Sequence, residues 1–455
     1  MRIDLITRPP SRLTLPFGPD EPSTTGRRVS VDFKSLSVDE SSSDLAQLSA
    51  LVFAIEGLRR THPSVDLDGA SVRIRGCSVH GGPEIQTTLQ AVLEFCIDVS
   101  LDFSLGVRRL VPGPTTDAKN TQSNAILLFS GGTDSLSGLA LCEQHRIRAT
   151  SVFVAHGSGT TGLINRLLGE SLAGRLTDFC PIHVQRRGDL QQTRGFLYAV
   201  LGGIVGRVRN TRDLIVSESG PTMFIPPMTP LDEVTLTTNP VVLALAQRLV
   251  RNSLEWNLRI HTPFRDLTKA ESIAWIRRDP ALIETNSCAR PQFASHPHPH
   301  CGSCFGCLVR RVSFLVAGAR DVAHRSDPLF SRFAWPGDSP DDGHGTVSAE
   351  QMADVLAVLS FCREVMLDRV HPAAREQMAT YHVEPLFRRF SLDFLTALHL
   401  GYQRGGFGRS SVVQRVYEAC LKDSLISASI ATERMAEVSE LKHKPSLDSP
   451  LVLAE

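Results

Sequence analysis

The chain has 455 residues, of which 42% are hydrophobic, 21% charged and 6% aromatic, and 48 Lys and Arg residues balance 48 Asp and Glu residues. A single hydrophobic core stops growing at about 250 to 300 residues, so this length predicts two or three domains. The composition is that of a globular protein and excludes a disordered or fibrous one. Zero net charge disfavours a protein that binds nucleic acid chiefly through its phosphates.

Membrane and secretory signals are not evident in the sequence. No window holds the roughly 18 apolar residues that a membrane span needs, and charged residues interrupt the apolar ones between Met1 and Arg8. We therefore expect a cytoplasmic protein without a membrane partner. In that setting, most of the ten cysteines are expected to be metal ligands or core thiols rather than disulfides.

Residues 1–119 are predicted to form a separate α+β accessory domain. Alternating apolar and polar residues at 28–33 and 71–75 favour strands, and the apolar spacing over 44–60 favours a helix. The polar, turn-rich segment 112–124 is predicted to be a linker.

Residues 120–325 alternate short apolar runs with longer helical stretches, which is typical of an α/β domain with a doubly wound parallel sheet. The expected strands cover residues 125–129, 150–155, 182–185, 214–217 and 257–261. The expected helices cover residues 135–145, 163–177, 193–209, 240–251 and 268–277. Such sheets bind ligands at the carboxyl ends of their strands, so the loops that begin at Ser130, His156 and Glu218 should share one crevice.

Residues 326–455 are predicted to form a helical C-terminal region. The polar segment 335–345 leads into expected helices at 349–368 and 412–422. From Lys442 onward the chain is polar and contains two prolines, which predicts a flexible tail.

The segment Ser130-Gly-Gly-Thr-Asp-Ser135 stands between the first of these strands and its helix. Glycines allow successive backbone N–H groups to converge on a phosphate, and the helix N-terminus adds the positive end of its dipole. Ser130, Thr133 and Ser135 add hydroxyl donors, while the lysine of a Walker A loop is absent. Asp134 suits a Mg²⁺ ion that bridges phosphates. The alternative is a tight turn that Asp134 caps.

Four cysteines share a spacing typical of a metal site, namely Cys288, Cys301, Cys304 and Cys307. Four thiolates can close a tetrahedral Zn²⁺ site, and we predict structural zinc. An iron–sulfur cluster also uses the Cys-x₂-Cys-x₂-Cys spacing and is the alternative. His296, His298 and His300 alternate with prolines and are expected to form an exposed spacer, although they could also ligate metal.

The loop Ser-Gly-Gly-x-Asp-Ser resembles that of the PP-loop ATP pyrophosphatases, which adenylate a carbonyl, carboxyl or amide oxygen and let a nucleophile displace AMP. Together with the segments 262–273 and 286–310, it resembles the 7-cyano-7-deazaguanine synthase (QueC) family. The resemblance covers residues 125 to about 320 and neither terminal addition. It implies a PP-loop fold with ATP, Mg²⁺ and Zn²⁺ as cofactors.

The resemblance also implies roles for individual residues. The ATP phosphates would lie on Ser130, Gly131, Gly132, Thr133, Asp134 and Ser135, with zinc on the four cysteines. Lys269, the only lysine between residues 120 and 421, would act with Asp134 and Arg194 at the reacting centre. Its alternative is an ordinary exposed lysine. Arg194 matches an arginine that the family follows with asparagine, where this chain has Gly195.

One loop departs from the family pattern. Where the synthases carry Tyr-Pro-Asp and Cys-Arg-Pro segments, this chain has Ser217 to Met228, from which Glu218 and Gly220 are expected to bind substrate. This loop and the two additions resemble QueC-like proteins of bacterial antiphage systems, among them QatC of the Qat system and its type IV CBASS counterpart. Those proteins are proposed to couple a deazaguanine acid to the N-terminal amine of a partner protein.

The resemblance therefore implies an ATP-dependent carbon–nitrogen ligase. Its substrates would be a 7-carboxy-7-deazaguanine-like acid and a partner protein of a defence system, with no membrane or direct nucleic-acid partner. Three alternatives stay open: a synthase of free 7-cyano-7-deazaguanine that uses ammonia, a tRNA-thiolating relative, and a non-catalytic ATP-binding scaffold.

Overall fold

The computed structural model describes residues 2–6, 13–15, 27–33, 36–61, 70–77, 82–107, 123–155, 172, 174–176, 178–185, 192–228, 236–288, 300–322, 324, 329, 349–403 and 411–447. Of the predicted elements, the helix over 163–177, the linker over 112–124 and the segment 335–345 fall wholly or mostly outside this part of the chain, as does His156. Within it, no helix combines the length and apolar composition needed to span a bilayer.

Seven strands form the central sheet, in the order β10-β9-β6-β7-β8-β3-β2. They are β2 (Leu13–Leu15), β3 (Arg27–Asp32), β6 (Ala125–Leu128), β7 (Ala149–Ala155), β8 (Phe179–Gln185), β9 (Asp213–Ile215) and β10 (Arg259–His261). The strands from β6 to β10 pair in parallel, whereas β3 pairs antiparallel with both β8 and β2. The chain is therefore a mixed α/β protein with a mostly parallel sheet, as the alternation of apolar runs and helices predicts.

Helices connect the parallel strands, namely α3 (Thr133–Gln144), α5 (Arg194–Val208), α6 (Gly220–Met223) and α7 (Pro240–Leu254). After β10 follow α8 (Lys269–Ile276), a 3₁₀ turn (Pro280–Glu284) and α9 (Phe305–Val316). These bounds confirm the expected strands and the other four expected helices of this region to within a few residues. Strands covered by helices on both faces are apolar on both faces, which explains the nearly continuous burial of β6.

The order of the parallel strands reverses beside β6. The chain adds β7 and β8 on one side of β6 and then crosses to add β9 and β10 on the other. At such a reversal the connections leave in opposite directions and open a crevice at the carboxyl ends of the strands. The loops after β6 and β9 therefore start side by side, as expected for the loops at Ser130 and Glu218.

The N-terminal segment contains α1 (Glu40–Thr61) and α2 (Gly82–Ile97) beside a parallel sheet of order β1-β4-β5, with β1 (Arg2–Ile6), β4 (Ala70–Cys77) and β5 (Leu101–Val107). This segment was expected to be a separate unit. Instead it is joined to the central domain, because β3 pairs with β8 and α1 packs against α5. An unpaired strand edge presents backbone donors and acceptors that need partners. Strand β3 supplies them for β8, so this segment is continuous with the central sheet.

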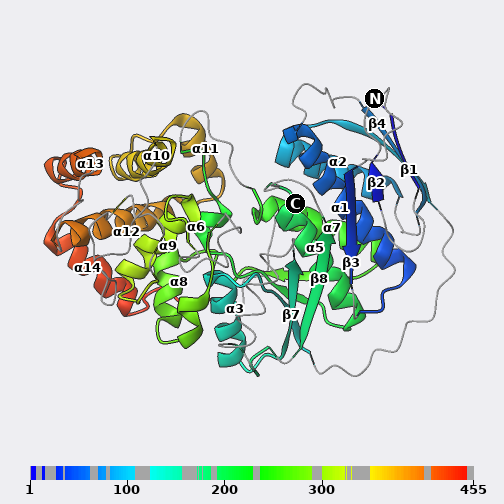
Figure 1. The fold of residues 1–455 in the computed structure, drawn as a ribbon, viewed down its shortest axis with the longest axis horizontal. Coiled ribbons are helices and arrows are strands. Elements are labelled where there is room, and N and C mark those ends of the chain that lie inside the picture. The colour runs from blue at the N-terminus through cyan, green and yellow to red at the C-terminus, as the bar shows by residue number, and fades with distance from the viewer. Residues whose placement is uncertain are drawn as a thin grey trace.

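The C-terminal region is helical, as predicted, with α10 (Ala349–Met366), α11 (Pro372–Thr380), α12 (Glu384–Gln403), α13 (Ser411–Lys422) and α14 (Ala428–Ser439). Helix α12 packs against α9 and α10, and α14 packs against α12 and α8. Figure 1 shows these helices on the opposite side of β7 and β8 from α1 and α2.

Two contacts lie within the part of the expected flexible tail that the structure describes, residues 442–447. The backbone N–H of Ser446 donates to the Pro263 carbonyl over 3.2 Å, and Nδ1 of His261 lies 3.2 Å from the Leu447 carbonyl oxygen. The polar composition of this segment concealed these backbone contacts, which dock it beside β10.

Arg310 on α9 forms a buried ion pair with Asp321 and hydrogen bonds with Thr285. These contacts attach the irregular segments around Thr285 and Asp321 to α9. The guanidinium of Arg310 donates to Asp321 over 2.8 Å and to the carbonyl and hydroxyl of Thr285 over 3.0 and 2.8 Å, and the Arg310 and Asp321 side chains are both 0% exposed. Burial by itself would raise the pKa of Asp321, but the charges of Arg310 and His324 hold that pKa well below its usual range.

Replacing this carboxylate tests its contribution to folding. Asp321→Asn leaves the buried Arg310 without a counterion, so we expect the free energy of unfolding to fall by about 3 kcal/mol in urea denaturation. Asp266, whose side chain is 78% exposed, is the matched control, and Asp266→Asn should cost less than about 0.5 kcal/mol. Equal losses in the two variants would contradict a special role for the buried pair.

Candidate functional site

The loop between β6 and α3 is held in shape by its own residues. Gly131 has a φ of +79°, which favours glycine. The Ser135 hydroxyl lies 2.8 Å from both the backbone nitrogen and the hydroxyl of Ser130. Helix α3 has Gly132 as its N-cap and no side-chain cap, so Asp134 does not cap this turn. The first N–H groups of α3 are thus left to an anion.

Lys269 and Asp134 form an ion pair that joins the first turns of α8 and α3. Lys269 is only 6% exposed, so it is not an ordinary surface lysine. A capping box fixes its helical turn, because the Thr268 hydroxyl accepts from the Glu271 backbone while the Glu271 carboxylate accepts from that of Thr268. The ammonium group is therefore held in place by both its partner and its backbone.

Glu218 follows β9 and faces the same ion pair. Loss of water around its carboxyl, together with the negative charge of Asp134, raises the pKa of Glu218 to about 7 despite the opposing charge of Lys269. Arg194, the exposed first residue of α5, has Glu218 as its strongest charged neighbour. The structure thus brings together Asp134, Glu218 and Lys269, and Arg194 interacts electrostatically with Glu218. We call these four residues the charged cluster.

The charged cluster offers carboxylate oxygens to a cation. Oδ1 of Asp134 is buried and has no hydrogen-bond partner among the described residues, and the Glu218 carboxyl lies beside it. Carboxylate oxygens are ligands that Mg²⁺ prefers. The Asp134 carboxylate therefore fits a Mg²⁺ ion that would arrive with phosphates, and Glu218 lies next to it.

Two glycines of the site are explained by close backbone contacts. A Cβ at Gly220 would lie 1.9 Å from the Arg265 carbonyl oxygen, and a Cβ at Gly195 would lie 1.4 Å from that of Thr237. No residue with a side chain fits either position without a backbone shift. For Gly220 this packing is sufficient reason for a glycine, and its contact with a substrate stays a prediction.

The four cysteines predicted as ligands converge, with their sulfur atoms all within 4.8 Å of one another. The Sγ atoms of Cys301 and Cys307 are 3.8 Å apart, which matches the edge of about 3.8 Å in a tetrahedron with Zn–S bonds of about 2.3 Å. Thiolates around a multi-iron cluster stand farther apart because the cluster lies between them. The set can therefore bind one metal ion such as zinc.

The backbone around this metal centre is shaped to present the sulfurs. Gly302 has a φ of +85°, and Cys304 is the N-cap of α9. The backbone N–H groups of Cys301 and Cys304 point to the sulfurs of Cys288 and Cys301 over 3.5 and 3.4 Å. Such N–H donors favour the thiolate form that a metal requires.

The metal centre and the β6–α3 loop are in direct contact. Asn286, two residues before Cys288, donates its backbone N–H to the Gly131 carbonyl over 3.1 Å. The hydroxyls of Thr133 and Ser287 lie 3.4 Å apart, and a Cβ at Gly132 would be 3.2 Å from the Asn286 carbonyl oxygen. Metal binding at Cys288 should therefore hold residues 286–288 against the loop.

One of the three histidines expected in an exposed spacer is instead buried. His300 is 0% exposed and stacks on His324 with the ring centroids 5.0 Å apart. Its burial follows from the bridge between the two backbones and from its place beside Cys301. His300 is not in the ligand set of the described residues, and His296 and His298 lie outside the described part of the chain.

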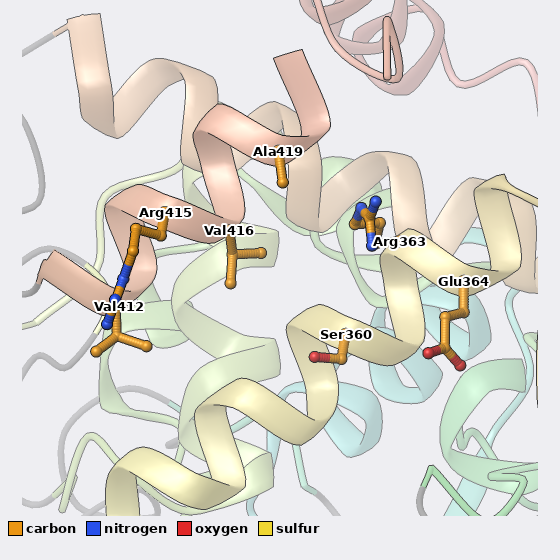
Figure 2. A pocket seen from close by; sticks show the side chains of 7 residues that line it. All are labelled: Ser360, Arg363, Glu364, Val412, Arg415, Val416 and Ala419. Atoms are coloured by element: carbon orange, nitrogen blue, oxygen red, sulfur yellow. The ribbon is translucent and has the colours of Figure 1, made fainter. Parts of the chain in front are cut away.

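A separate pocket of about 270 Å³, open to solvent, lies between α10 and α13. Figure 2 shows Ser360 and Glu364 of α10 opposite Val412 and Val416 of α13. It shares no residue with the charged cluster or the metal centre.

Sequence reasoning missed two buried charges that touch the helices of the site, Glu56 and Arg434. Each acts over more than a hundred residues of chain, so no local pattern indicates it. The Thr-x-x-Glu capping box at Thr268 was readable from the sequence.

No protein-family model matches this chain, and no curated protein matches it. Its function must therefore be inferred from its own residues and their geometry.

Removing one cysteine tests the metal centre. Wild-type protein should contain about one zinc ion per chain by elemental mass spectrometry, and Cys304→Ser should lose most of it, since a closed structural site needs four ligands. Cys142, a buried cysteine outside the set whose pKa burial raises to about 12, is the control, and Cys142→Ala should keep the metal. Visible absorption typical of an iron–sulfur cluster in the purified protein would contradict the zinc assignment.

Glu218 should make stability depend on pH. Its folded-state pKa of about 7 lies above its ordinary value of 4.5, so its contribution to stability is complete below about pH 4.5 and is lost as the pH rises through about 7. Glu218→Gln imitates the protonated form and should raise the melting temperature at pH 8 while leaving it nearly unchanged at pH 5. Glu433, exposed on α14, is the control. A gain that is equal at both pH values would argue against a raised pKa.

Proposed function

We propose that this chain is an ATP-dependent carbon–nitrogen ligase of the PP-loop type. The observation that carries the proposal is the charged cluster of Asp134, Arg194, Glu218 and Lys269 beside an uncapped glycine-rich helix start. This combination suits a nucleoside triphosphate, because phosphates need both backbone donors and fixed cations.

The strand order supports a nucleotide site at this place. With β6 counted as the first parallel strand, the order is 3-2-1-4-5, as in doubly wound nucleotide-binding sheets, and the glycine loop follows strand 1. The resemblance of this loop to the PP-loop ATP pyrophosphatases adds the reaction type, which is cleavage of ATP to AMP and pyrophosphate.

The proposed reaction has two steps. A carboxylate oxygen of the acid attacks the α-phosphorus of ATP, which breaks the bond to the β-phosphate and releases pyrophosphate. An amine then attacks the carbonyl carbon of the acyl adenylate, so that an amide bond forms, AMP leaves and the amine loses a proton. Glu218, with a pKa of about 7, is suited to accept that proton near neutral pH.

The cations of the site would stabilise the charge that develops in the first step. Lys269 and Arg194 lie at the starts of two helices that meet at the charged cluster, and fixed positive charge lowers the barrier to pyrophosphate departure. Mg²⁺, held by Asp134, would neutralise further phosphate charge when bound.

The loop after β9 favours one of the two possible products. It supports an amide, formed from an acid and an amine, over a free nitrile. Residues 217–228 differ from the synthase pattern, and their backbone is held by the C-terminal region, where the amide of Gln377 donates to the carbonyls of Phe224 and Ile225 over 3.1 and 2.9 Å. Gly195, which replaces the family's asparagine, leaves no room for that side chain. We therefore propose a 7-carboxy-7-deazaguanine-like acid as substrate and the N-terminal amine of a defence-system partner protein as acceptor.

Pyrophosphate release tests this function. With ATP, Mg²⁺, the acid and candidate acceptors, wild-type protein should form AMP and pyrophosphate in equal amounts. Lys269→Met should slow this by about 100-fold, because it removes a fixed cation from the transition state, and Asp134→Ala should abolish it. Lys422→Met, at the end of α13, is the control and should keep full activity.

Mass spectrometry of the products separates the alternatives. An adduct on a partner polypeptide supports the ligase. A free nitrile formed from ammonia would identify a synthase instead, thiolated RNA a tRNA-modifying relative, and tight ATP binding without pyrophosphate release under every condition a scaffold.

A further inference from the structure

Both cations of the charged cluster stand at the start of a helix, and a buried charge from a terminal addition binds residues at each of these helix starts. We propose that Glu56 and Arg434 are positioning residues, Glu56 for Arg194 and Arg434 for Lys269. Figure 1 shows the helices that carry them, α1 and α14, on opposite sides of the central strands. The inference uses the proposed function only for its ATP-binding readout.

Glu56 caps the helix that begins with Arg194. It is 0% exposed, and its carboxylate accepts from the backbone N–H groups of Gln192 and Thr193 over 2.9 Å each and from the Thr193 hydroxyl over 2.7 Å. Helix α5 has no side-chain cap from its own N-cap residue. A carboxylate at this end is stabilised by the helix dipole and by charge-assisted hydrogen bonds. The point at which Arg194 leaves the helix is thus fixed by α1.

The same carboxylate adds negative charge behind the start of α5. Glu56 binds the N–H groups of Gln192 and Thr193, the two residues that precede the helix. Arg194 interacts electrostatically with both Glu218 and Glu56.

Arg434 performs the matching task at α8. Its side chain is 1% exposed, and it donates to Glu271 over 2.9 Å and to Asp393 over 2.8 Å. The second carboxylate oxygen of Glu271 accepts from the backbone N–H of Thr268 over 2.8 Å. Arg434 therefore orients the carboxylate that closes the helical turn beginning with Lys269.

The position of Lys269 leaves little tolerance for movement. It is 6% exposed and paired with Asp134 on another helix, so a small shift of α8 separates the two groups. Misplacement of a site group by about 1 Å can lower a rate about 100-fold. The two additions thus contribute to the arrangement of the site.

A double-mutant cycle distinguishes positioning from general stabilisation. Glu56→Ala should weaken ATP binding about tenfold in calorimetric titration, but less than about twofold when Arg194→Ala is already present. Likewise, Arg434→Met should weaken ATP binding about tenfold by itself, but less than about twofold when Lys269→Met is already present. Glu56→Gln keeps one acceptor oxygen, and Arg434→Lys keeps the positive charge. These two variants should cause intermediate losses of ATP affinity, and they should stay folded even where the larger changes prevent folding.

The matched controls are exposed residues of the same additions. Glu94 on α2 and Arg415 on α13 are exposed, and Glu94→Ala and Arg415→Met should leave ATP affinity unchanged. If each variant loses the same ATP affinity whether Arg194 or Lys269 is present or replaced, the positioning roles are wrong and the proposed function still stands.

Hydrogen exchange gives a readout that needs no ATP. Glu56→Gln should speed exchange at residues 192–197 but not at 268–273, and Arg434→Lys should do the reverse. If wild-type protein binds no ATP, the proposed function fails, and this local pattern alone decides the inference. Unchanged protection, or protection lost across the chain, would overturn it.

Discussion

The ion pair between Lys269 and Asp134 is the contact on which the arrangement of the site depends. A buried pair persists only where geometry and further hydrogen bonds offset the loss of water around both charges. Here both partners lie in the first turn of a helix, so any movement of α3 or α8 changes the pair. A phosphate entering the loop would compete with Asp134 for the ammonium, which couples occupancy of the loop to the electrostatics of Glu218.

The surroundings of this pair restrict both helices from several sides. Asn286 and Ser287 press on the β6–α3 loop next to the metal centre, while Glu271 closes the first turn of α8. A metal knuckle is suited to such a task because its bonds hold an irregular segment that has little apolar surface of its own. A metal ion on the four cysteines, together with the helix caps, would thus hold the segments around the crevice in place.

The central domain could be predicted well because its signals are local. Apolar runs mark β6 to β10 to within a few residues, and the crevice rule for doubly wound sheets predicts that the loops at Ser130 and Glu218 lie together. Other contacts join segments that are distant in sequence. Strand β3 pairs with β8, and Glu56 binds the backbone of Gln192 across 136 positions. Neither contact has a local pattern, and the docking of Ser446 was likewise hidden by a polar composition.

Long separations along the chain also govern when the site can form during translation. The ribosome releases Asp134 well before Lys269, which follows 135 positions later, and Thr133 meets Ser287 across 154 positions. Long-range contacts form late because loop closure is costly in entropy. A nascent chain that ends before residue 287 therefore exposes the strands of the sheet with an incomplete crevice, so premature termination should yield aggregation-prone fragments rather than a partly formed site.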